Sequence, residues 1–372
     1  MRILLIGDYS NMHSQLGCAL RMLGHDVTVM SDGCNFQNTA RDIDVTRRPG
    51  KLNGVMLTLR LLGPLHRHMR GYDVVALQNP HFITLKPKRL RYIFDRLCGE
   101  NRSVFLTAAG FDTAYLDMAL DPHGPLRYSE WRIGDRPAPF AISHAADLAA
   151  WRTPEMRAYH DYVYSRLTGV VSALYEYHIA SAAVLGDDKV AYGGIPVDTR
   201  LLKPFDMQGS DECVNFFLGR HRERQTEKGT DLLETAARRI VSRYPGHARL
   251  TIVENRPWAE YVQLMRQSHV VLDQIYSYSP ATNALIAMSH ALATVSGAEP
   301  EFYRFIGEDK SFPVINAPTD VDALTETLDD IVRQRAALAG RGRESREFAV
   351  RHNDHLTVAR RFVDAWRRLG GF

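Results

Sequence analysis

A cluster of basic side chains beside a glycine is the part of this sequence best suited to chemistry. The stretch 216–233 reads FFLGRHRERQTEKGTDLL. After Gly219 it carries five basic or potentially basic residues: Arg220, His221, Arg222, Arg224 and Lys228. Arginine, lysine and the N-terminus of a following helix are groups that together bind a diphosphate. The alternative is a solvated, charged loop that binds nothing.

The elements on either side of this loop decide where it lies. The apolar run from Val214 to Leu218 is continuous rather than alternating, which predicts a strand buried in a parallel sheet. A periodic segment from Asp231 to about Arg243 predicts a helix. The loop then follows the carboxyl end of a strand, where open α/β sheets bind ligands, and the helix turns its positive end towards it.

A second polar stretch follows a strand predicted from His269 to Leu272. It contains Asp273, Gln274, Tyr276, Tyr278, Ser279 and Pro280, and a helix opens over 281–283 with Thr282 and Asn283. Ser279 or Thr282 is expected to cap this helix. Its free backbone N–H groups would face the same crevice as Arg224 and Lys228, so we expect a diphosphate to be held from two sides. Tyr276 and Tyr278 are alternatively packing aromatics.

The N-terminal half opens with a predicted β-α-β unit. Arg2 to Ile6 forms a strand, a helix carries Leu16, Leu20 and Leu23, and HDVTVMSDG supplies the next strand after Gly24. The first loop, GDYSNMH, lacks the G-x-G-x-x-G spacing of dinucleotide sites, which argues against NAD and FAD. It does offer hydrogen-bonding side chains to an acceptor substrate: Tyr9, Ser10, Asn11 and His13. Helix capping explains Ser10 and Asn11 equally well, and His13 is alternatively a surface residue.

Two further strands of this half end in candidate groups. A strand from Asp73 to Leu77 leads to Asn79, a candidate acceptor ligand, and a strand from Ser103 to Thr107 ends in AAGFD. Gly110 permits close backbone approach, and Asp112 lies where a carboxylate could meet a substrate hydroxyl. The alternative for Asp112 is helix capping.

Other segments carry weaker signals. Residues 50–70 predict a helix with basic ends that is broken at Gly63-Pro64; its apolar face is either core or a contact for a lipid-linked substrate, and core is the preferred interpretation. No chemistry is assigned to 116–157. The glycine- and proline-rich segment 193–204, GGIPVDTRLLKP, is interpreted as a hinge between domains.

Composition fits a soluble globular protein of two domains. The chain has 372 residues, 45% hydrophobic and 24% charged, with a net charge of +3 that is too small to argue for nucleic acid. Four scattered cysteines indicate a reducing compartment. The short apolar run after Met1 argues against a signal peptide, so we expect a cytoplasmic protein, and the arginine-rich C-terminal part leaves peripheral membrane contact open. Asp329 and Asp330 are expected on a solvated helix face, and no metal site is predicted.

Several segments resemble motifs of one family. GGIPVDTRLLKP is similar to a P-x-G-V-D segment that precedes a second domain, GRHRERQTEKGTDLL to a G-R…K-G phosphate motif, and NALIAMSHALATVSG to an E-A-M-A-x-G-x-P-V-V helix and strand. Together they resemble the retaining GT-B-type glycosyltransferases commonly called glycosyl transferases group 1. MRILLIGDYSN and SGAEPEFYRFIGE resemble a branch found among bacterial surface-polysaccharide enzymes.

The resemblance implies roles for individual residues. Lys228 and either Arg220 or Arg224 would bind the donor diphosphate. The family's two glutamates, eight residues apart, fall here on Tyr278 and Ile286. Because isoleucine accepts no hydrogen bond, Asn283 or Glu254 would have to contact the ribose. The family's acceptor-loop histidine is missing from AAGFD, and Asp112 or His13 would replace it.

The resemblance also implies the whole architecture. We expect an α/β protein of two Rossmann-like domains facing across a cleft: an acceptor domain over 1–200, a nucleotide-sugar domain over 201–350, and a C-terminal helix over 351–372 that packs back on the first domain. The implied reaction moves a sugar, with retention, from a nucleotide donor to a saccharide or lipid-linked acceptor without a metal or other cofactor. The alternatives are a non-catalytic binding protein on the same fold and a nucleotide-sugar epimerase.

Overall fold

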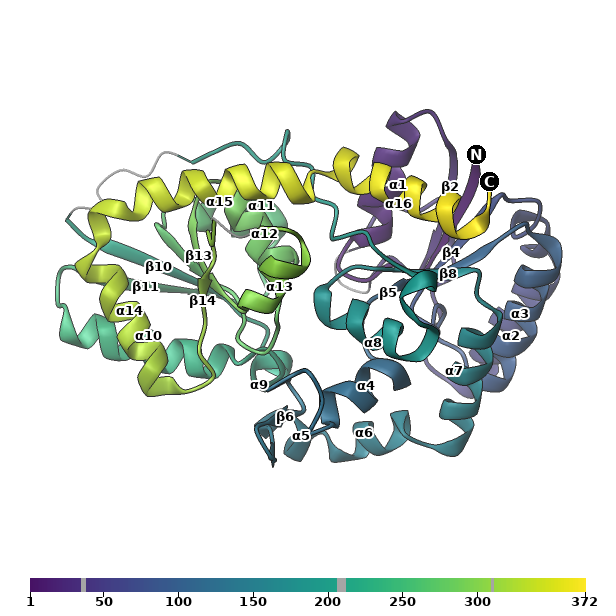
Figure 1. Ribbon diagram of the computed structural model, residues 1–372, viewed down its shortest axis with the longest axis horizontal. Helices are drawn as coiled ribbons and strands as arrows, with labels where there is room; N and C mark the ends of the chain where they lie inside the picture. Colours follow the sequence, from purple (N-terminus) through teal and green to yellow (C-terminus); the bar gives the residue numbers. More distant parts are fainter. Residues whose placement is uncertain (35–37, 206–211, 309–310) are drawn as a thin grey trace. The chain divides into compact units, whose positions relative to one another are not determined.

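A computed structural model describes residues 1–34, 38–205, 212–308 and 311–372 (Figure 1). The chain forms two compact units. Unit 1 consists of residues 1–118, 145–196 and 355–372, and unit 2 of residues 119–144 and 197–354. Each unit is built around its own parallel sheet.

The sheet of unit 1 has seven strands in the order β3-β2-β1-β4-β5-β8-β9. The strands are β1 (Arg2–Ile6), β2 (Asp26–Ser31), β3 (Ile43–Asp44), β4 (Val74–Gln78), β5 (Val104–Ala108), β8 (Gly169–Ser172) and β9 (Val190–Tyr192). β1 pairs in parallel with β2 on one side and β4 on the other, with Ile3 opposite both Val27 and Val74. The central strands are buried along their length, as their continuous apolar residues predicted.

Helices cover this sheet. They are α1 (Met12–Met22), α2 (Lys51–Leu62), α3 (Pro87–Glu100), α4 (Thr113–Leu120), α6 (Ala145–Trp151), α7 (Pro154–Arg166), α8 (Tyr175–Leu185) and α16 (His355–Gly370). The C-terminal helix α16 packs against α1, β8 and β9, so the end of the chain returns to the first unit as expected. Phe362 and Trp366 of α16 are fully buried there.

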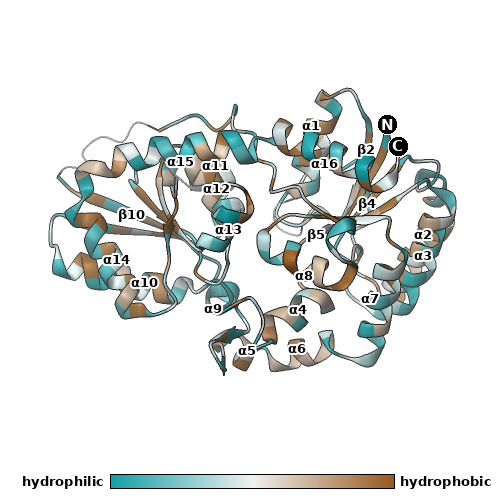
Figure 2. Ribbon diagram, in the orientation of Figure 1, coloured by the Kyte–Doolittle hydropathy of each residue, from teal (hydrophilic) through white to brown (hydrophobic). Residues whose placement is uncertain are grey.

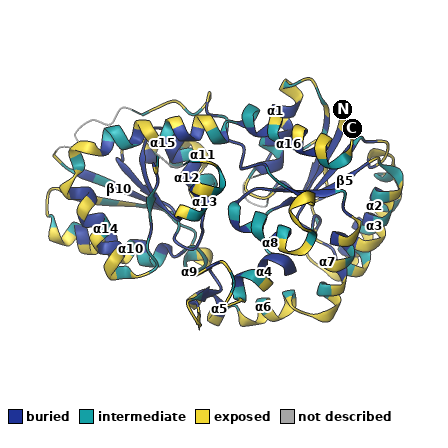
Figure 3. Ribbon diagram, in the orientation of Figure 1, coloured by how far each residue is buried: buried dark blue, intermediate teal, exposed yellow. Residues whose placement is uncertain are grey.

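The sheet of unit 2 has the order β11-β10-β12-β13-β14. Its strands are β10 (Val214–Gly219), β11 (Ala248–Val253), β12 (Val270–Leu272), β13 (Ala293–Ser296) and β14 (Ile315–Asn316). Its helices are α9 (Gln225–Lys228), α10 (Thr230–Arg243), α11 (Trp258–Met265), α12 (Thr282–Ser289), α13 (Pro300–Phe305), α14 (Val321–Arg333) and α15 (Leu338–Asn353). Strands that are hydrophobic in Figure 2, such as β10, are buried in Figure 3.

Residues 119–144 belong to unit 2, although they interrupt the sequence of unit 1. They form the antiparallel pair β6 (Arg132–Ile133) and β7 (Arg136–Pro137), followed by the short helix α5 (Pro139–Ser143), which contacts α9. Trp131 and Phe140 pack together with ring centroids 4.7 Å apart. Local sequence patterns do not predict this placement, because the contacts join residues more than 80 positions apart.

One expected surface residue is buried. Asp329 lies on α14 with a side chain that is 0% exposed, whereas Asp330 faces solvent. Arg243 and Arg333 contact the Asp329 carboxylate at 2.8 and 2.7 Å. The interpretation of both aspartates as solvated was therefore wrong for Asp329, since an arginine on the neighbouring helix α10 pairs with it. Across the described ranges, no helix is both long and apolar enough to span a membrane.

Candidate functional site

The edge of the unit 2 sheet at the carboxyl ends of β10 and β12 is the candidate site. From β10 the chain passes through α10 to β11 on one side, and it then returns through α11 to β12 on the other side of β10. This reversal is a topological switch point, where open α/β sheets leave a crevice at the carboxyl ends of their strands. The two polar loops singled out in the sequence follow these two strands.

A backbone hydrogen bond joins the two loops. The N–H of Ile275, after β12, donates to the carbonyl of Lys228, after β10, at 2.8 Å. Gly229 follows in the left-handed conformation, with φ of 70°. A Cβ at this glycine would lie 3.0 Å from the Ile275 side chain, so both the φ angle and the close approach favour glycine. The Lys-Gly pair therefore fixes where Lys228 lies at the sheet edge.

The charges of the loop are largely compensated, with one exception. Arg220 donates to Glu254 and Glu234, and its side chain is only 17% exposed. These carboxylates also pair with further arginines: Arg222 with Glu254 and Arg238 with Glu234. The hydrogen bond from Arg220 lowers the pKa of Glu254, although burial opposes this shift.

Arg224 and Lys228 differ in their surroundings. Arg224 forms an ion pair with Glu227, three residues away in the same loop, and about half of its side chain is exposed. The ammonium group of Lys228 has no ion-pair or hydrogen-bond partner among the residues that the structure describes. Lys228 is therefore the loop cation whose charge remains available to an anionic ligand.

Two helix N-termini flank the sheet edge. The cap position of α12 is Ala281, which has no capping side chain, and the first turn contains no acidic residue. The expected caps, Ser279 and Thr282, are therefore wrong. Because alanine has no side-chain acceptor, the cap residue itself does not occupy the first-turn N–H groups, which are the groups of a helix that bind anions. The first turn of α10 is less suited to an anion because it contains the carboxylate of Asp231.

A network of side-chain hydrogen bonds joins the elements at this edge of the unit 2 sheet. Tyr261 donates to Asn283 at 2.7 Å, Asn283 donates to Asp273 at 3.1 Å, and Ser296 donates to the second oxygen of Asp273 at 3.3 Å. Asp273 is 2% exposed. A Cβ at Gly219 would lie 2.1 Å from the Tyr261 hydroxyl oxygen, so only glycine fits beneath this ring. Asp273 and Asn283, expected to touch the donor, thus hold neighbouring elements together.

An aromatic pair at this edge was missed. Trp258, the first residue of α11, stacks on Tyr261 with ring centroids 6.0 Å apart and remains 54% exposed. An exposed tryptophan stacked on a partly buried tyrosine presents a flat surface of the kind that a nucleobase stacks on. The Trp-x-x-Tyr spacing of Trp258 and Tyr261 was the available sequence signal.

Tyr278 packs against the inserted residues 119–144. Its hydroxyl oxygen accepts a hydrogen bond from the backbone N–H of Arg127, and its ring lies 5.1 Å from that of Tyr128. Tyr128 donates to Glu299 at 2.6 Å. The structure thus gives Tyr278 the packing role that was the alternative interpretation. Tyr276 is 7% exposed, and burial raises its pKa to about 12.

The corresponding edge of unit 1 gathers the candidate acceptor residues. The switch point of this sheet lies between β1 and β4, and the backbone N–H of Tyr9 donates to Gln78 across it at 2.9 Å. Ser10 and Asn11 both have positive φ, 53° and 64°. Neither caps α1; the carboxylate of Asp8 accepts from the backbone N–H of His13 at 2.9 Å instead. Among the described residues, the Ser10 hydroxyl and the Asn11 amide have no hydrogen-bond partner.

His13 is fully buried rather than on the surface. Its Nδ1 lies 2.8 Å from the carbonyl of Gly7 and its Nε2 lies 2.9 Å from Oγ1 of Thr107. Since a carbonyl only accepts, Nδ1 carries the proton and Nε2 accepts from the threonine. Burial lowers the pKa of His13 to about 3. Both ring nitrogens are occupied, so His13 joins the first loop to β5.

Asn79 and Asp112 are also occupied by the protein itself. Asn79 donates to the carbonyls of Ala109 and Phe111 at 3.0 and 2.9 Å. Asp112 accepts from the backbone N–H of Tyr115 at 2.8 Å and from the hydroxyl of Tyr164 at 2.7 Å, and burial raises its pKa. Asp112 therefore caps α4, as the alternative interpretation held.

In the part of the chain that the structure describes, no group of three or more His, Cys, Asp or Glu side chains is arranged to hold a metal ion.

Solved structures of known proteins share this fold. Sucrose-phosphate synthase from Thermosynechococcus elongatus aligns over 100% of both chains with a TM-score of 0.66 and 14% identity. HepE from Anabaena, in complex with UDP-glucose, aligns over 98% of this chain and 99% of its own with a TM-score of 0.59 and 12% identity. A putative UDP-N-acetylglucosamine 2-epimerase from Listeria monocytogenes aligns over 98% and 95% with a TM-score of 0.55 and 11% identity.

Sequence comparison adds no relative. No family model matches the chain, and no curated protein matches it either. At identities of 11 to 14%, the structural matches establish the fold. The chain has two Rossmann-like domains of the GT-B type.

Proposed function

We propose that this protein is a glycosyltransferase that binds a nucleotide-sugar donor at the edge of unit 2 between β10 and β12. The observation that carries the proposal is the cation of Lys228, which has no partner among the described residues and lies at the topological switch point. The uncapped N-terminus of α12 supports it from the adjacent loop. A nucleotide sugar supplies the diphosphate that such a pair of groups binds.

The chemistry follows from where negative charge develops. Transfer breaks the bond between the anomeric carbon of the sugar and the diphosphate oxygen, and it forms a bond from that carbon to an acceptor hydroxyl oxygen, whose proton passes to the departing diphosphate. The leaving diphosphate gains charge as its bond breaks. Lys228 and the first-turn N–H groups of α12 are fixed groups that stabilise this charge without a metal ion. We propose that the acceptor oxygen bonds on the face from which the diphosphate departs, so that configuration is retained.

Arg220 is the arginine that we assign to the donor. Two glutamates hold its side chain in place through Nε and Nη1, and Nη2 has no partner among the residues described. Arg224 is more exposed than Arg220 and forms an ion pair with Glu227. A preoriented guanidinium loses less entropy when it binds a phosphate oxygen than a mobile one does. We assign the nucleobase to the exposed face of Trp258, because this ring is stacked on Tyr261 and offers a flat surface.

The acceptor is proposed to be a hydroxyl of a saccharide or lipid-linked saccharide in bacterial polysaccharide or glycoconjugate synthesis. Ser10 and Asn11 are the side chains that we assign to its recognition, because both project from the switch-point loop of unit 1 and neither has a partner in the described structure. His13, Asn79 and Asp112 act behind them by holding the loops in place.

Calorimetric titration with the nucleoside and its diphosphate tests the donor site. A panel of UDP-, GDP- and ADP-sugars first identifies the base that binds, and Lys228→Ala is then compared with Lys189→Ala, an exposed lysine of unit 1. We expect Lys228→Ala to lower the affinity for the nucleoside diphosphate about tenfold or more and to leave the affinity for the nucleoside unchanged, since only the diphosphate carries negative charge. Equal losses for both ligands, or the same losses in Lys189→Ala, would refute the phosphate role.

An epimerase is the second candidate, because the putative epimerase from Listeria monocytogenes shares the fold over almost the whole chain. Incubation of the bound nucleotide sugar with and without an oligosaccharide acceptor separates the two activities. A transferase releases nucleoside diphosphate when the acceptor is present, whereas an epimerase converts the sugar without an acceptor. Binding of nucleotide sugars without either product would identify a non-catalytic binding protein.

A further inference from the structure

The outer face of α2 carries an unusual stripe of exposed apolar side chains. Leu52, Val55, Met56 and Leu59 are 78%, 39%, 60% and 64% exposed. Their spacing of three and four residues places them in one row along the helix. The opposite face, with Leu57 and Leu61, is buried in the core of unit 1. The prediction that the apolar residues of this helix are core residues is therefore correct for only one of its two faces.

The surroundings of this stripe are strongly basic. Residues 47–96 contain eleven lysines and arginines but only two aspartates and no glutamate, whereas the whole chain has a net charge of +3. The rest of the chain is therefore net negative, and positive charge is concentrated around α2 and α3. Exposed members of this group on and beside the two helices include Arg48, Lys51, Arg60, Lys86, Lys88, Arg91 and Arg96.

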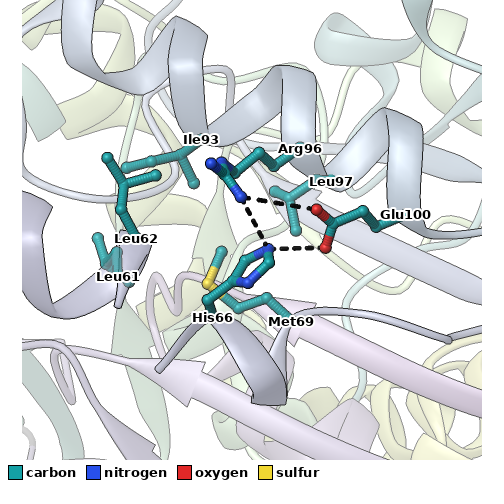
Figure 4. Close-up of a pocket in the computed structure, with 8 residues that line it drawn as sticks. All are labelled: Leu61, Leu62, His66, Met69, Ile93, Arg96, Leu97 and Glu100. Carbon is teal, nitrogen blue, oxygen red and sulfur yellow. Dashed lines mark hydrogen bonds and ion pairs between the residues drawn. The ribbon is translucent and has the colours of Figure 1, made fainter. Parts of the chain in front are cut away.

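The neighbouring helix α3 extends the same surface. α2 and α3 pack side by side (Figure 1), and Tyr92 of α3 is 62% exposed. A hollow between the two helices is lined in part by Glu100, the carboxylate that follows this basic segment in the sequence. Figure 4 shows that Glu100 is bonded to neighbouring side chains of the same unit. Glu100 pairs with His66 at 2.7 Å and with Arg96 at 3.7 Å. Its negative charge is thus compensated and does not oppose the positive surface.

We infer that this surface, formed by the outer faces of α2 and α3, docks on an anionic lipid bilayer. Four apolar side chains in a row suit the acyl boundary, lysines and arginines beside them suit anionic headgroups, and an exposed tyrosine suits the interface between the two. A folded protein partner would need a surface complementary in shape to these two helices. A bilayer needs only an apolar interior and negatively charged headgroups. The positive charge of this segment favours an anionic bilayer over a second copy of the chain, since two positively charged surfaces repel each other.

This inference concerns unit 1 alone and does not rest on the proposed donor site. It would place the protein at a membrane surface, where a lipid-linked acceptor is found. Binding to the surface is measured without any sugar substrate, so its outcome is independent of the activity.

Co-sedimentation of the full chain with lipid vesicles tests the inference. One set of vesicles contains phosphatidylcholine alone and the other also contains phosphatidylglycerol. We expect binding to the anionic vesicles only, weakened by added salt because the headgroup attraction is screened. The double variant Leu52→Gln/Leu59→Gln should bind at least about tenfold more weakly, since it lacks two of the exposed apolar side chains that would enter the bilayer. The matched control is Leu201→Gln, because Leu201 is also 78% exposed but lies in unit 2.

Three results would overturn the inference. One is absence of binding to the anionic vesicles by the parent chain. Another is equal binding by the double variant and the parent, which would leave only nonspecific charge attraction. The third is a dimer seen by light scattering that the double variant abolishes, without vesicle binding, which would assign the surface to a second copy of the chain. Circular dichroism of each variant confirms that the substitutions, all at exposed positions, leave the fold intact.

Discussion

Acidification should destabilise unit 1 through a buried histidine. His13 is 0% exposed, its two ring nitrogens are bonded to Gly7 and Thr107, and burial lowers its pKa from 6.5 to about 3. Below about pH 6.5 the unfolded chain therefore binds a proton that the folded chain does not. For such a group the stabilisation is complete above the unfolded-state pKa and is lost as the pH falls towards 3.

The size of the effect follows from the two pKa values. Each pH unit below the unfolded-state pKa costs about 1.4 kcal/mol, so His13 alone should remove about 2 kcal/mol of the free energy of unfolding between about pH 8 and pH 5. His160 of α7 is also fully buried with a pKa lowered to about 3, and it should add a similar loss.

Urea denaturation of the parent and of His13→Gln, measured at both pH values, isolates the contribution of His13. The glutamine variant is expected to be less stable at pH 8, because it loses the bonded ring, but its further loss on acidification should be smaller than that of the parent by about 2 kcal/mol. Nuclear magnetic resonance of the ring protons provides an independent readout, in which the His13 signal should not titrate between pH 8 and pH 5. A His13 ring that titrates near pH 6.5, or identical losses in the two proteins, would refute the reasoning.

Three further predictions concern the edge of unit 2. Gly219→Ala should destabilise the protein by about 1–3 kcal/mol in urea denaturation and weaken donor binding, because the new Cβ would displace Tyr261; an unchanged denaturation midpoint would contradict this. Trp258→Ala should lower the affinities for the nucleoside and for its diphosphate to the same degree, about tenfold. Ligand binding should quench tryptophan fluorescence in the parent but much less in the variant. An unchanged affinity would show that Trp258 is not part of the site. Treatment with a metal chelator should leave the transfer rate unchanged, since Lys228 and the N-terminus of α12 supply the positive charge; loss of activity restored by a divalent cation would disprove this.

The sheets of both units could be predicted closely from the sequence. Buried parallel strands read as short apolar runs: β1 lies at the predicted residues Arg2–Ile6, and β10, predicted from Val214 to Leu218, ends one residue later at Gly219. The same local patterns located the two loops at the switch point of unit 2. What could not be predicted is the placement of residues 119–144 in unit 2, because it depends on the contacts of Arg127 and Tyr128 with Glu299, which are remote in sequence.

The individual site residues were harder to assign than the loops that carry them. A sequence shows that a polar side chain follows a strand, but not whether the protein itself uses its polar atoms. His13, Asn79 and Asp112 are bonded within unit 1, while Arg220 and Arg222 of unit 2 pair with carboxylates from other elements. Lys228 and Arg224 were both predicted to act, but the carboxylate of Glu227 pairs with Arg224. The distinction depends on side-chain geometry that composition and spacing do not contain.

The two switch-point edges differ in a way that fits different kinds of recognition. The edge of unit 2 keeps a cation and uncapped helix N–H groups open above a bonded network that anchors Asp273. Such fixed positive groups stabilise a charged diphosphate because they need no reorganisation when charge develops. The edge of unit 1 keeps the neutral side chains of Ser10 and Asn11 open and holds them in left-handed conformations. Holding non-glycine residues there costs free energy, which is expected where a loop presents its side chains to a ligand. Neutral hydrogen-bonding groups suit sugar hydroxyls, so the charge difference between the two edges favours the donor on unit 2 and the acceptor on unit 1.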